Sequence, residues 1–303
     1  MNADILILKQ AAVVMICLFG VAGAITLAAR NTGWGRDMGF ATVSWAVICA
    51  LFLLVPYAGP IPFSLLMSGI AILAVREFYK MSGICGSLRL GTSAVFIVAM
   101  AAALLCNNEI LFHRLPLIAV VVMFLLHARV FSYENIKSAV GVQAVGLVYW
   151  GWLLLHWLLL QRLNCGYGLI VTLCTMVLVN DNGAFFFGKL FGKNSPKFAP
   201  RISPNKTWVG FAGGVLGTLL VAWGYGFALP QLSLLQRLLL GVVVGVAIPV
   251  GGLIESAMKR DSGVKDSSNL IPGHGGVMDR FDSWAFSAPI VYVLMLFFAK
   301  HPF

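Results

Sequence analysis

Ionic side chains are concentrated in residues 255–282, which read ESAMKRDSGVKDSSNLIPGHGGVMDRFD. Of the 11 acidic and 21 basic residues of the chain, this stretch holds Glu255, Asp261, Asp266, Asp279 and Asp282 together with Lys259, Arg260, Lys265 and Arg280. Carboxylate oxygens are ligands that Mg²⁺ prefers, and Lys and Arg side chains bind phosphate oxygens. The mixture is therefore typical of a site for a metal ion together with a polyphosphate.

Two of these carboxylates have a spacing that suits a metal site. Asp279 and Asp282 are three residues apart, so on a helix they lie on one face. We expect that helix to begin at the membrane boundary, with Asp266 approaching from the preceding loop, so that the three carboxylates meet one Mg²⁺ ion. Glu255 is a further candidate ligand. The alternative is that two aspartates in a first turn only complement the helix dipole.

A second polar segment, residues 180–207, reads NDNGAFFFGKLFGKNSPKFAPRISPNKT. Asp181 interrupts or ends an apolar span, and an acidic residue at membrane depth is costly enough to be a functional candidate, here also as a metal ligand. Its alternative role is to cap a helix or to pair with a nearby lysine. The end of the segment offers a phosphate and ribose grip around a proline turn, from Ser203, Asn205, Lys206 and Thr207. Taken alone, it would be an ordinary solvated loop.

The elements that must position these residues are membrane helices. The 303 residues are 60% hydrophobic and only 11% charged, with a mean hydropathy of +0.91, whereas soluble domains carry about 25% charged residues. We therefore predict an all-α, polytopic integral membrane protein. About ten apolar stretches approach the ~20 residues that a spanning helix needs, and nine is also compatible. They lie at 11–29, 40–57, 61–75, 91–106, 115–132, 140–160, 168–187, 208–229, 236–256 and 283–299.

The distribution of charge predicts orientation. Lys and Arg collect after the third, seventh and ninth stretches, which are loops on one side, and the positive-inside rule makes that side the cytoplasm. Both chain ends then lie outside. The net charge of +10 is explained by this topology and by anionic membrane lipids rather than by nucleic acid, because the basic residues have no regular aromatic interleaving. We divide the chain into generic membrane helices, 1–165, and a region with both polar segments, 166–303.

The two segments together resemble a known family. The string Ser256-x-x-Lys259-Arg260-x4-Lys265-Asp266, then Pro272-Gly273-His274-Gly275-Gly276-x-x-Asp279-Arg280-x-Asp282, closely resembles the signature of the phosphatidate cytidylyltransferases, or CDP-diacylglycerol synthases. The patterns D-x-G-A-[FY], G-K-x-x-G-K and I-S-P-x-K-T-W in the second segment are similar to the other conserved block of that family. The resemblance covers roughly residues 181–282.

The resemblance implies an activity and a location. The expected enzyme joins CTP to phosphatidate, releases pyrophosphate and leaves CDP-diacylglycerol, with Mg²⁺ as cofactor and room for a second cation, for example a monovalent one such as K⁺. It would be a multi-pass protein of the bacterial inner membrane, in contact with membrane lipids, with its active site facing the cytoplasm. A homodimer is compatible with this reading.

The resemblance also assigns roles to residues. The catalytic group is Lys259, Asp266, His274, Asp279, Arg280 and Asp282; the substrate-binding group is Asp181, Ser203, Asn205, Lys206, Thr207, Ser256, Arg260, Lys265, Gly275 and Gly276. The Lys and Arg residues of residues 259–280 are candidate phosphate clamps, although any one of them could instead be a positive-inside anchor. His274 could bind a phosphate or transfer a proton; because the attacking phosphate is already ionised near neutral pH, positioning is the better role.

This chain departs from the family pattern at two places. Members commonly carry Gly-Asp-Leu-x-Glu-Ser before Lys-Arg, whereas Gly252 stands here in place of that Asp; Val209 replaces the Glu or Gln of K-T-W-[EQ]-G. A divergent paralogue is therefore expected. The alternatives are an enzyme for a different lipid phosphate and a non-catalytic protein that binds CTP or CDP-lipid. A transporter would place polar motifs in two symmetric halves, but here they occupy only the second half.

Overall fold

The computed structural model describes residues 3–28, 33–130, 136–268 and 275–301. The apolar stretches form helices, since only a helix or a closed barrel satisfies every backbone polar group inside hydrocarbon. The helices are α1 (Ala3–Ala28), α2 (Gly33–Ala58), α3 (Pro60–Met81), α4 (Ser87–Leu105), α5 (Glu109–Val130), α6 (Ile136–Gly146), α7 (His156–Gln161), α8 (Gly166–Phe191), α9 (Trp208–Gly224), α10 (Leu234–Asp261) and α11 (Met278–Lys300). A π-helical turn, Leu147–Leu153, joins α6 to α7, and short 3-10 turns lie at Gly192–Asn194 and Tyr225–Phe227.

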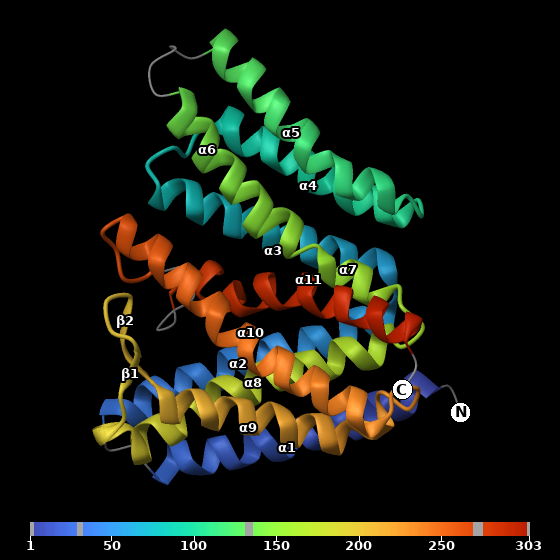
Figure 1. Cartoon of the computed structure of the whole chain (residues 1–303), viewed down its shortest axis with the longest axis vertical. Helices are drawn as coiled ribbons and strands as arrows, with labels where there is room; N and C mark the ends of the chain where they lie inside the picture. Colours follow the sequence, from blue (N-terminus) through green and yellow to red (C-terminus); the bar gives the residue numbers. More distant parts are fainter. Residues whose placement is uncertain (1–2, 29–32, 131–135, 269–274, 302–303) are drawn as a thin grey trace.

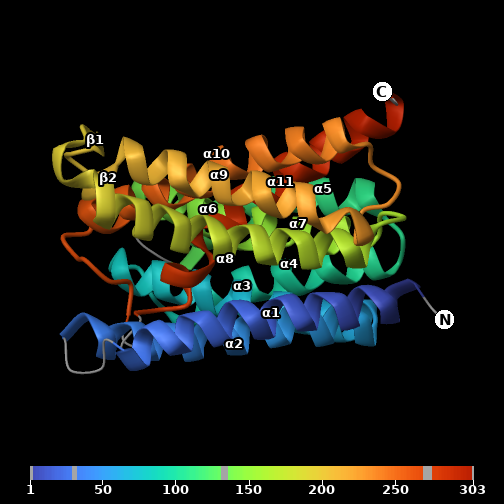
Figure 2. The ribbon, with the colours of Figure 1, turned by 90° about the horizontal axis from the view of Figure 1, so that it is seen from below.

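The predicted fold class is confirmed. Within the described ranges, nine helical segments are long and apolar enough to cross a membrane, and Thr42–Ala58 is a shorter apolar helix. The helices run roughly along one direction, and α11 lies between α3 and α10 (Figures 1 and 2). α1 begins and α11 ends at the same end of the bundle (Figure 1).

The opposite end of the bundle carries a small hairpin (Figure 1). Strands β1 (Lys197–Ala199) and β2 (Ser203–Thr207) pair antiparallel. Lys197 lies opposite Thr207 and Ala199 opposite Ser203, and the register is irregular between these two pairs. The Thr207 hydroxyl then accepts the backbone N–H of Gly210 at 3.1 Å and caps α9. Residues expected as a loop around a proline turn are thus held between a strand pair and a helix start.

Glycines bring α8, α9 and α10 into close contact. A Cβ on Gly217 would lie 2.8 Å from Val179, and one on Gly245 would lie 2.5 Å from the Thr218 hydroxyl, so no larger residue fits without movement. Small residues at such positions let membrane helices pack closely. The three helices therefore pack tightly against one another.

α11 is fixed by an aromatic cluster. Trp284 is fully buried, and its ring centroid lies 4.8 Å from that of Trp157 and 4.4 Å from that of Phe52. The Trp157 indole N–H also donates to the Trp284 carbonyl oxygen at 3.1 Å. Because buried aromatic side chains contribute much of the packing energy, these contacts fix the N-terminal part of α11 in the bundle.

Six free thiols lie on the helices or in the connections between them. Cys85 lies two residues before the start of α4, and Cys106 directly follows its end. Both thiols are exposed. Cys49 and Cys174 are buried in the helix bundle.

Candidate active site

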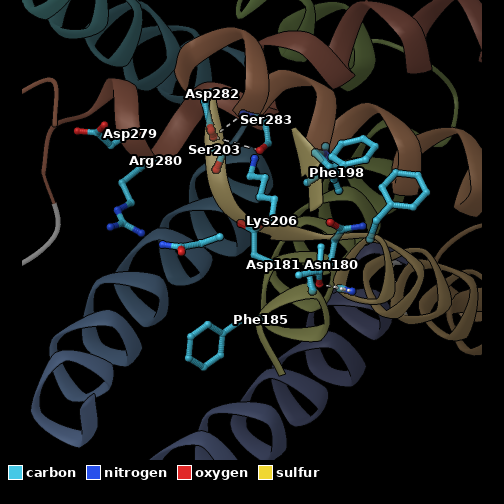
Figure 3. A pocket seen from close by; sticks show the side chains of 18 of the residues that line it. Asn180, Asp181, Phe185, Phe198, Ser203, Lys206, Asp279, Arg280, Asp282 and Ser283 are labelled. Atoms are coloured by element: carbon cyan, nitrogen blue, oxygen red, sulfur yellow. Dashed lines mark hydrogen bonds between the residues drawn. The ribbon is translucent and has the colours of Figure 1, made fainter. Parts of the chain in front are cut away.

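A cavity of about 420 Å³ lies where α8, the hairpin, α9, α10 and α11 meet (Figure 3). One part of its lining is polar: Asn180, Asp181, Ser203, Asn205, Lys206, Thr207, Asp279, Arg280, Asp282 and Ser283. Another part is apolar: Trp45, Phe185, Phe198, Phe211, Ile248 and Pro249. The fold thus brings the two polar sequence segments to one cavity, whose lining also includes apolar residues from α2, α8, β1, α9 and α10.

Asp282 and Lys206 flank Gly252 in this cavity. The Oδ1 atom of Asp282 accepts the backbone N–H of Ser283 at 2.6 Å and its hydroxyl at 3.1 Å (Figure 3). A Cβ on Gly252 would lie 3.1 Å from Oδ2 of Asp282 and 2.8 Å from Nζ of Lys206. Position 252 therefore does project beside the site groups, between a carboxylate and an ammonium.

Asp181 and Arg280 complete the ionic lining. Asp181 lies within electrostatic range of Asp282, Lys206 and Arg280. It does not cap a helix, since α8 continues to Phe191. Arg280 in turn interacts with Asp181, Asp282 and Asp279. Two cations and two carboxylates, from α8, β2 and α11, consequently share one cavity, which suits the binding of a charged phosphate chain with its counterion.

Asp279 has a different environment. Its Oδ1 atom accepts Nζ of Lys259 at 2.7 Å, and Oδ2 accepts the backbone N–H groups of Ser267 and Gly276 at 3.0 and 2.7 Å. The Ser267 hydroxyl adds a fourth bond at 2.8 Å. Lys259 also lies 2.7 Å from Glu255. Both oxygens of Asp279 are therefore engaged by the protein, and Lys259 is shared between two carboxylates.

Gly275 and Gly276 lie close to other groups of the protein, where a larger side chain would not fit. Gly275 has a φ of +80°, a conformation that favours glycine. A Cβ there would collide with the carboxylate of Asp279, and one on Gly276 would collide with the Ser267 hydroxyl. The two glycines thus let the chain fold tightly around Asp279.

The remaining predicted residues do not line the cavity, although Asp266 lies within electrostatic range of Arg280. Lys265 and Asp266 are exposed, and Arg260, also exposed, donates to the Val264 carbonyl oxygen at 2.8 Å. Outside the cavity lining are Glu255, Ser256, Lys259, Arg260, Lys265, Asp266, Gly275 and Gly276. His274 lies outside the described residues.

The expected three-carboxylate metal site is not present in the described ranges. Across them, no group of three or more His, Cys, Asp or Glu side chains is arranged to hold a metal ion. Mg²⁺, however, commonly binds through one or two carboxylates plus water and substrate phosphates rather than in a cage of protein ligands. Asp181 and Asp282 provide two such carboxylates at the cavity. The residues therefore fit a Mg²⁺ ion that arrives with a polyphosphate.

One residue that sequence reasoning missed is Glu77 on α3. Its carboxylate is buried, with 5% exposure, and accepts the hydroxyls of Ser267 and Ser268 at 3.2 and 2.7 Å. It also accepts the backbone N–H of Met278 at 2.9 Å. The rule that selected Asp181, an acidic residue inside an apolar span, also applies to Glu77, the one carboxylate of α3.

Comparison with known proteins identifies relatives over most of the chain. The sequence pattern of the "Cytidylyltransferase family" matches residues 40–298. The phosphatidate cytidylyltransferase of Bacillus subtilis (strain 168) is 31% identical over 277 residues, which cover 87% of this chain and 99% of the relative. The phosphatidate cytidylyltransferase of Brucella suis biovar 1 is 40% identical over 173 residues, 54% of this chain and 60% of the relative. The uncharacterized protein YnbB of Escherichia coli (strain K12) is 37% identical over 161 residues, 50% of this chain and 53% of the relative.

Proposed function

The chain belongs to the cytidylyltransferase family and is a multi-pass membrane nucleotidyltransferase, and on this premise we propose that it transfers the cytidylyl group of CTP to phosphatidate. The observation that carries the proposal is a cavity lined by residues of both polar segments together with apolar side chains. The charged phosphate chain of a nucleotide requires polar groups, and the apolar tail of a lipid requires apolar side chains.

The proposed reaction is an in-line displacement. An oxygen of the lipid phosphate attacks the α-phosphorus of CTP, a new P–O bond forms, and the bond to the leaving pyrophosphate breaks. The lipid phosphate is already ionised near neutral pH, so no general base is required. Lys206 and Arg280, both at the cavity, would hold phosphate oxygens and stabilise the charge that develops on pyrophosphate.

Mg²⁺ is part of the proposal. When bound, the ion would neutralise phosphate charge and orient the leaving group. Asp181 and Asp282 would hold it, because both carboxylates line the cavity. A second cation, for example K⁺, remains a prediction.

We also infer that the cavity faces the cytoplasm. The hairpin beside it carries Lys197, Arg201 and Lys206 at one end of the helix bundle. Basic residues next to spanning helices favour the cytoplasmic side.

An assay of purified protein tests the activity. With phosphatidate, Mg²⁺ and CTP labelled at the α-phosphorus, label should enter the lipid; label at the γ-phosphorus should leave as pyrophosphate. Omission of phosphatidate or chelation of Mg²⁺ should remove the product. Lys80→Ala, an exposed lysine on α3, is a matched control for the cavity variant Lys206→Ala. No labelled lipid from the parent protein across several phosphatidic acids would argue against the proposal.

Gly252 favours a second candidate function. Where the family commonly has an aspartate, this cavity has only a glycine between Lys206 and Asp282. Loss of one carboxylate is expected in a protein that binds CTP or CDP-lipid without turning it over. Retained CTP binding without any product would support this candidate, and product from another lipid phosphate would instead redefine the substrate.

A further inference from the structure

Glu77 connects the N-terminal region to the segment that leads into α11. Its carboxylate bonds to Ser267 and Ser268, which follow α10, and to Met278, the first residue of α11. The partners are some 190 to 201 positions away along the chain. One side chain of α3 therefore holds both described ends of the connection between α10 and α11.

The burial of this carboxylate has a physical compensation. Removing a carboxylate from water is costly unless hydrogen bonds replace the lost hydration. Here the Ser268 hydroxyl and the Met278 N–H do so, together with the Ser267 hydroxyl, whose single proton is shared with Asp279; none of the three donors is itself charged. The N–H of Met278 belongs to the first turn of α11, where donors lack intrahelical partners and the helix dipole favours a negative group.

Ser267 links Glu77 to the network around Asp279. Its hydroxyl lies 2.8 Å from Oδ2 of Asp279 and 3.2 Å from Oε2 of Glu77. Gly276 lies against both, because a Cβ there would collide with Ser267 and Glu77. A shift of Glu77 would therefore move the first turn of α11, which carries Arg280 and Asp282 to the cavity.

We propose that Glu77 is a positioning residue for the transfer reaction. It does not line the cavity; it fixes the start of α11 so that Arg280 and Asp282 meet the substrate phosphates in the right place. This inference rests on the proposed function. It assigns to α3, in a region whose sequence is generic, a part in the geometry of the site.

Glu77→Gln tests the proposal at nearly constant volume. The amide keeps one acceptor oxygen and replaces the other with an NH2 donor, which faces either the Ser268 hydroxyl or the Ser267 hydroxyl and the Met278 N–H. We expect kcat to fall about 10-fold to 100-fold, the scale for misplacement of reacting groups, with little change in the KM for CTP or phosphatidate. Arg76→Gln is the matched control, because Arg76 is the exposed neighbour on α3. It should behave as the parent.

Hydrogen exchange provides a readout that does not depend on activity. In Glu77→Gln, the backbone amides at the start of α11 should exchange faster, while those of α8 and α9 remain as in the parent. Ser268→Ala removes one of the three bonds and should lower kcat by about threefold, the value of one hydrogen bond. In the Glu77→Gln background the same change should have little further effect.

Each outcome decides the question. An unchanged kcat, or faster exchange in every helix, would overturn a positioning role. If Glu77→Gln does not fold in detergent, Ser268→Ala still tests the inference, and unchanged kcat and exchange in that variant overturn it. If the parent turns over no lipid phosphate with CTP, the proposed function fails, and unaltered exchange at α11 in Glu77→Gln would separately refute the positioning of that helix.

Discussion

Asp279 and Asp282 lie one turn apart on α11, yet the protein surrounds them in opposite ways. Asp279 is enclosed by Lys259, Ser267 and Gly276, which engage both of its oxygens. Asp282 is bonded through one oxygen to its neighbour Ser283, and its other oxygen lies beside the glycine-lined part of the cavity. One carboxylate thus holds the chain together, and the other is placed for a ligand.

The contrast shows what spacing on a helix does and does not determine. Two residues three apart share a face, but the groups opposite that face decide the chemistry. Around Asp279 those groups are Lys259 at the end of α10 and Ser267 and Gly276 of the following connection. Around Asp282 they are Lys206 of the hairpin and Gly252, which has no side chain. Substitutions at the two positions should therefore differ in kind.

The largest effect on activity is expected for Asp282→Asn. It removes charge at the cavity with little change of volume, and turnover should fall about 10²-fold to 10³-fold, the scale for loss of one electrostatic catalytic group. The melting temperature in detergent should stay near that of the parent. Asp261→Asn removes an equal charge at an exposed site and serves as control. Turnover close to that of the parent would show that Asp282 has no part in the reaction.

Asp279→Asn should instead lower stability as well as activity. The variant loses a charge-assisted bond to Lys259, although Lys259 keeps Glu255 as a partner. We expect a loss of about 1 to 3 kcal/mol in the free energy of unfolding, the cost of breaking a hydrogen bond to a charged group. Thermal unfolding in detergent measures it. Unaltered stability together with lost turnover would place Asp279 with Asp282 as a ligand-binding residue.

Cationic residues allow the same comparison inside and outside the cavity. Lys206→Ala and Arg280→Ala should each weaken CTP binding or turnover by about 1 to 3 kcal/mol, the range for charge-assisted hydrogen bonds. Arg76→Ala, at an exposed residue of α3 outside the cavity, should leave both nearly unchanged. Binding of labelled CTP measures the difference. Equal affinity in all three variants would mean that the phosphate clamp lies elsewhere.

The smallest effect is expected for Gly252→Asp. The new carboxylate would stand between Lys206 and Asp282, where Lys206 can move because its ammonium ends a flexible side chain. Activity at limiting Mg²⁺ should rise, because the apparent free energy of Mg²⁺ binding should improve by about 0.5 to 1.5 kcal/mol, the net value of one added interaction. Gly252→Asn has the same shape without the charge. A rise of the same size in that control would assign the effect to shape and not to a metal ligand.

The spans could be predicted because hydrocarbon imposes a simple rule on sequence. Apolar stretches near the length of a bilayer must be helical, and nine of the predicted stretches each overlap one α-helix, while 140–160 comprises α6, the π-helical turn and α7. The ends could not be predicted as well. α11 begins at Met278, before the apolar run at 283, because a helix continues into polar residues wherever its terminal groups find partners.

The site was predictable only in part. The family resemblance assigned Lys206 and Asp282 to one site, and both residues line the same cavity. It gave no sign that Asp279 would be engaged by Ser267 or that Asp266 would be exposed, since these depend on how one connection folds. Glu77 was missed because its partners lie on the far side of the sequence.

The thiols at the two ends of α4 give this topology a chemical label. Cys85 and Cys106 are both exposed and are separated by a helix of 19 residues, which spans about 28 Å at 1.5 Å per residue. For a helix that spans the membrane, we therefore expect the two thiols at opposite surfaces, Cys85 on the side of Lys80 and Arg89 and Cys106 on the other. A maleimide that cannot cross the bilayer should therefore label Cys85 from one side and Cys106 from the other, without any engineered residue.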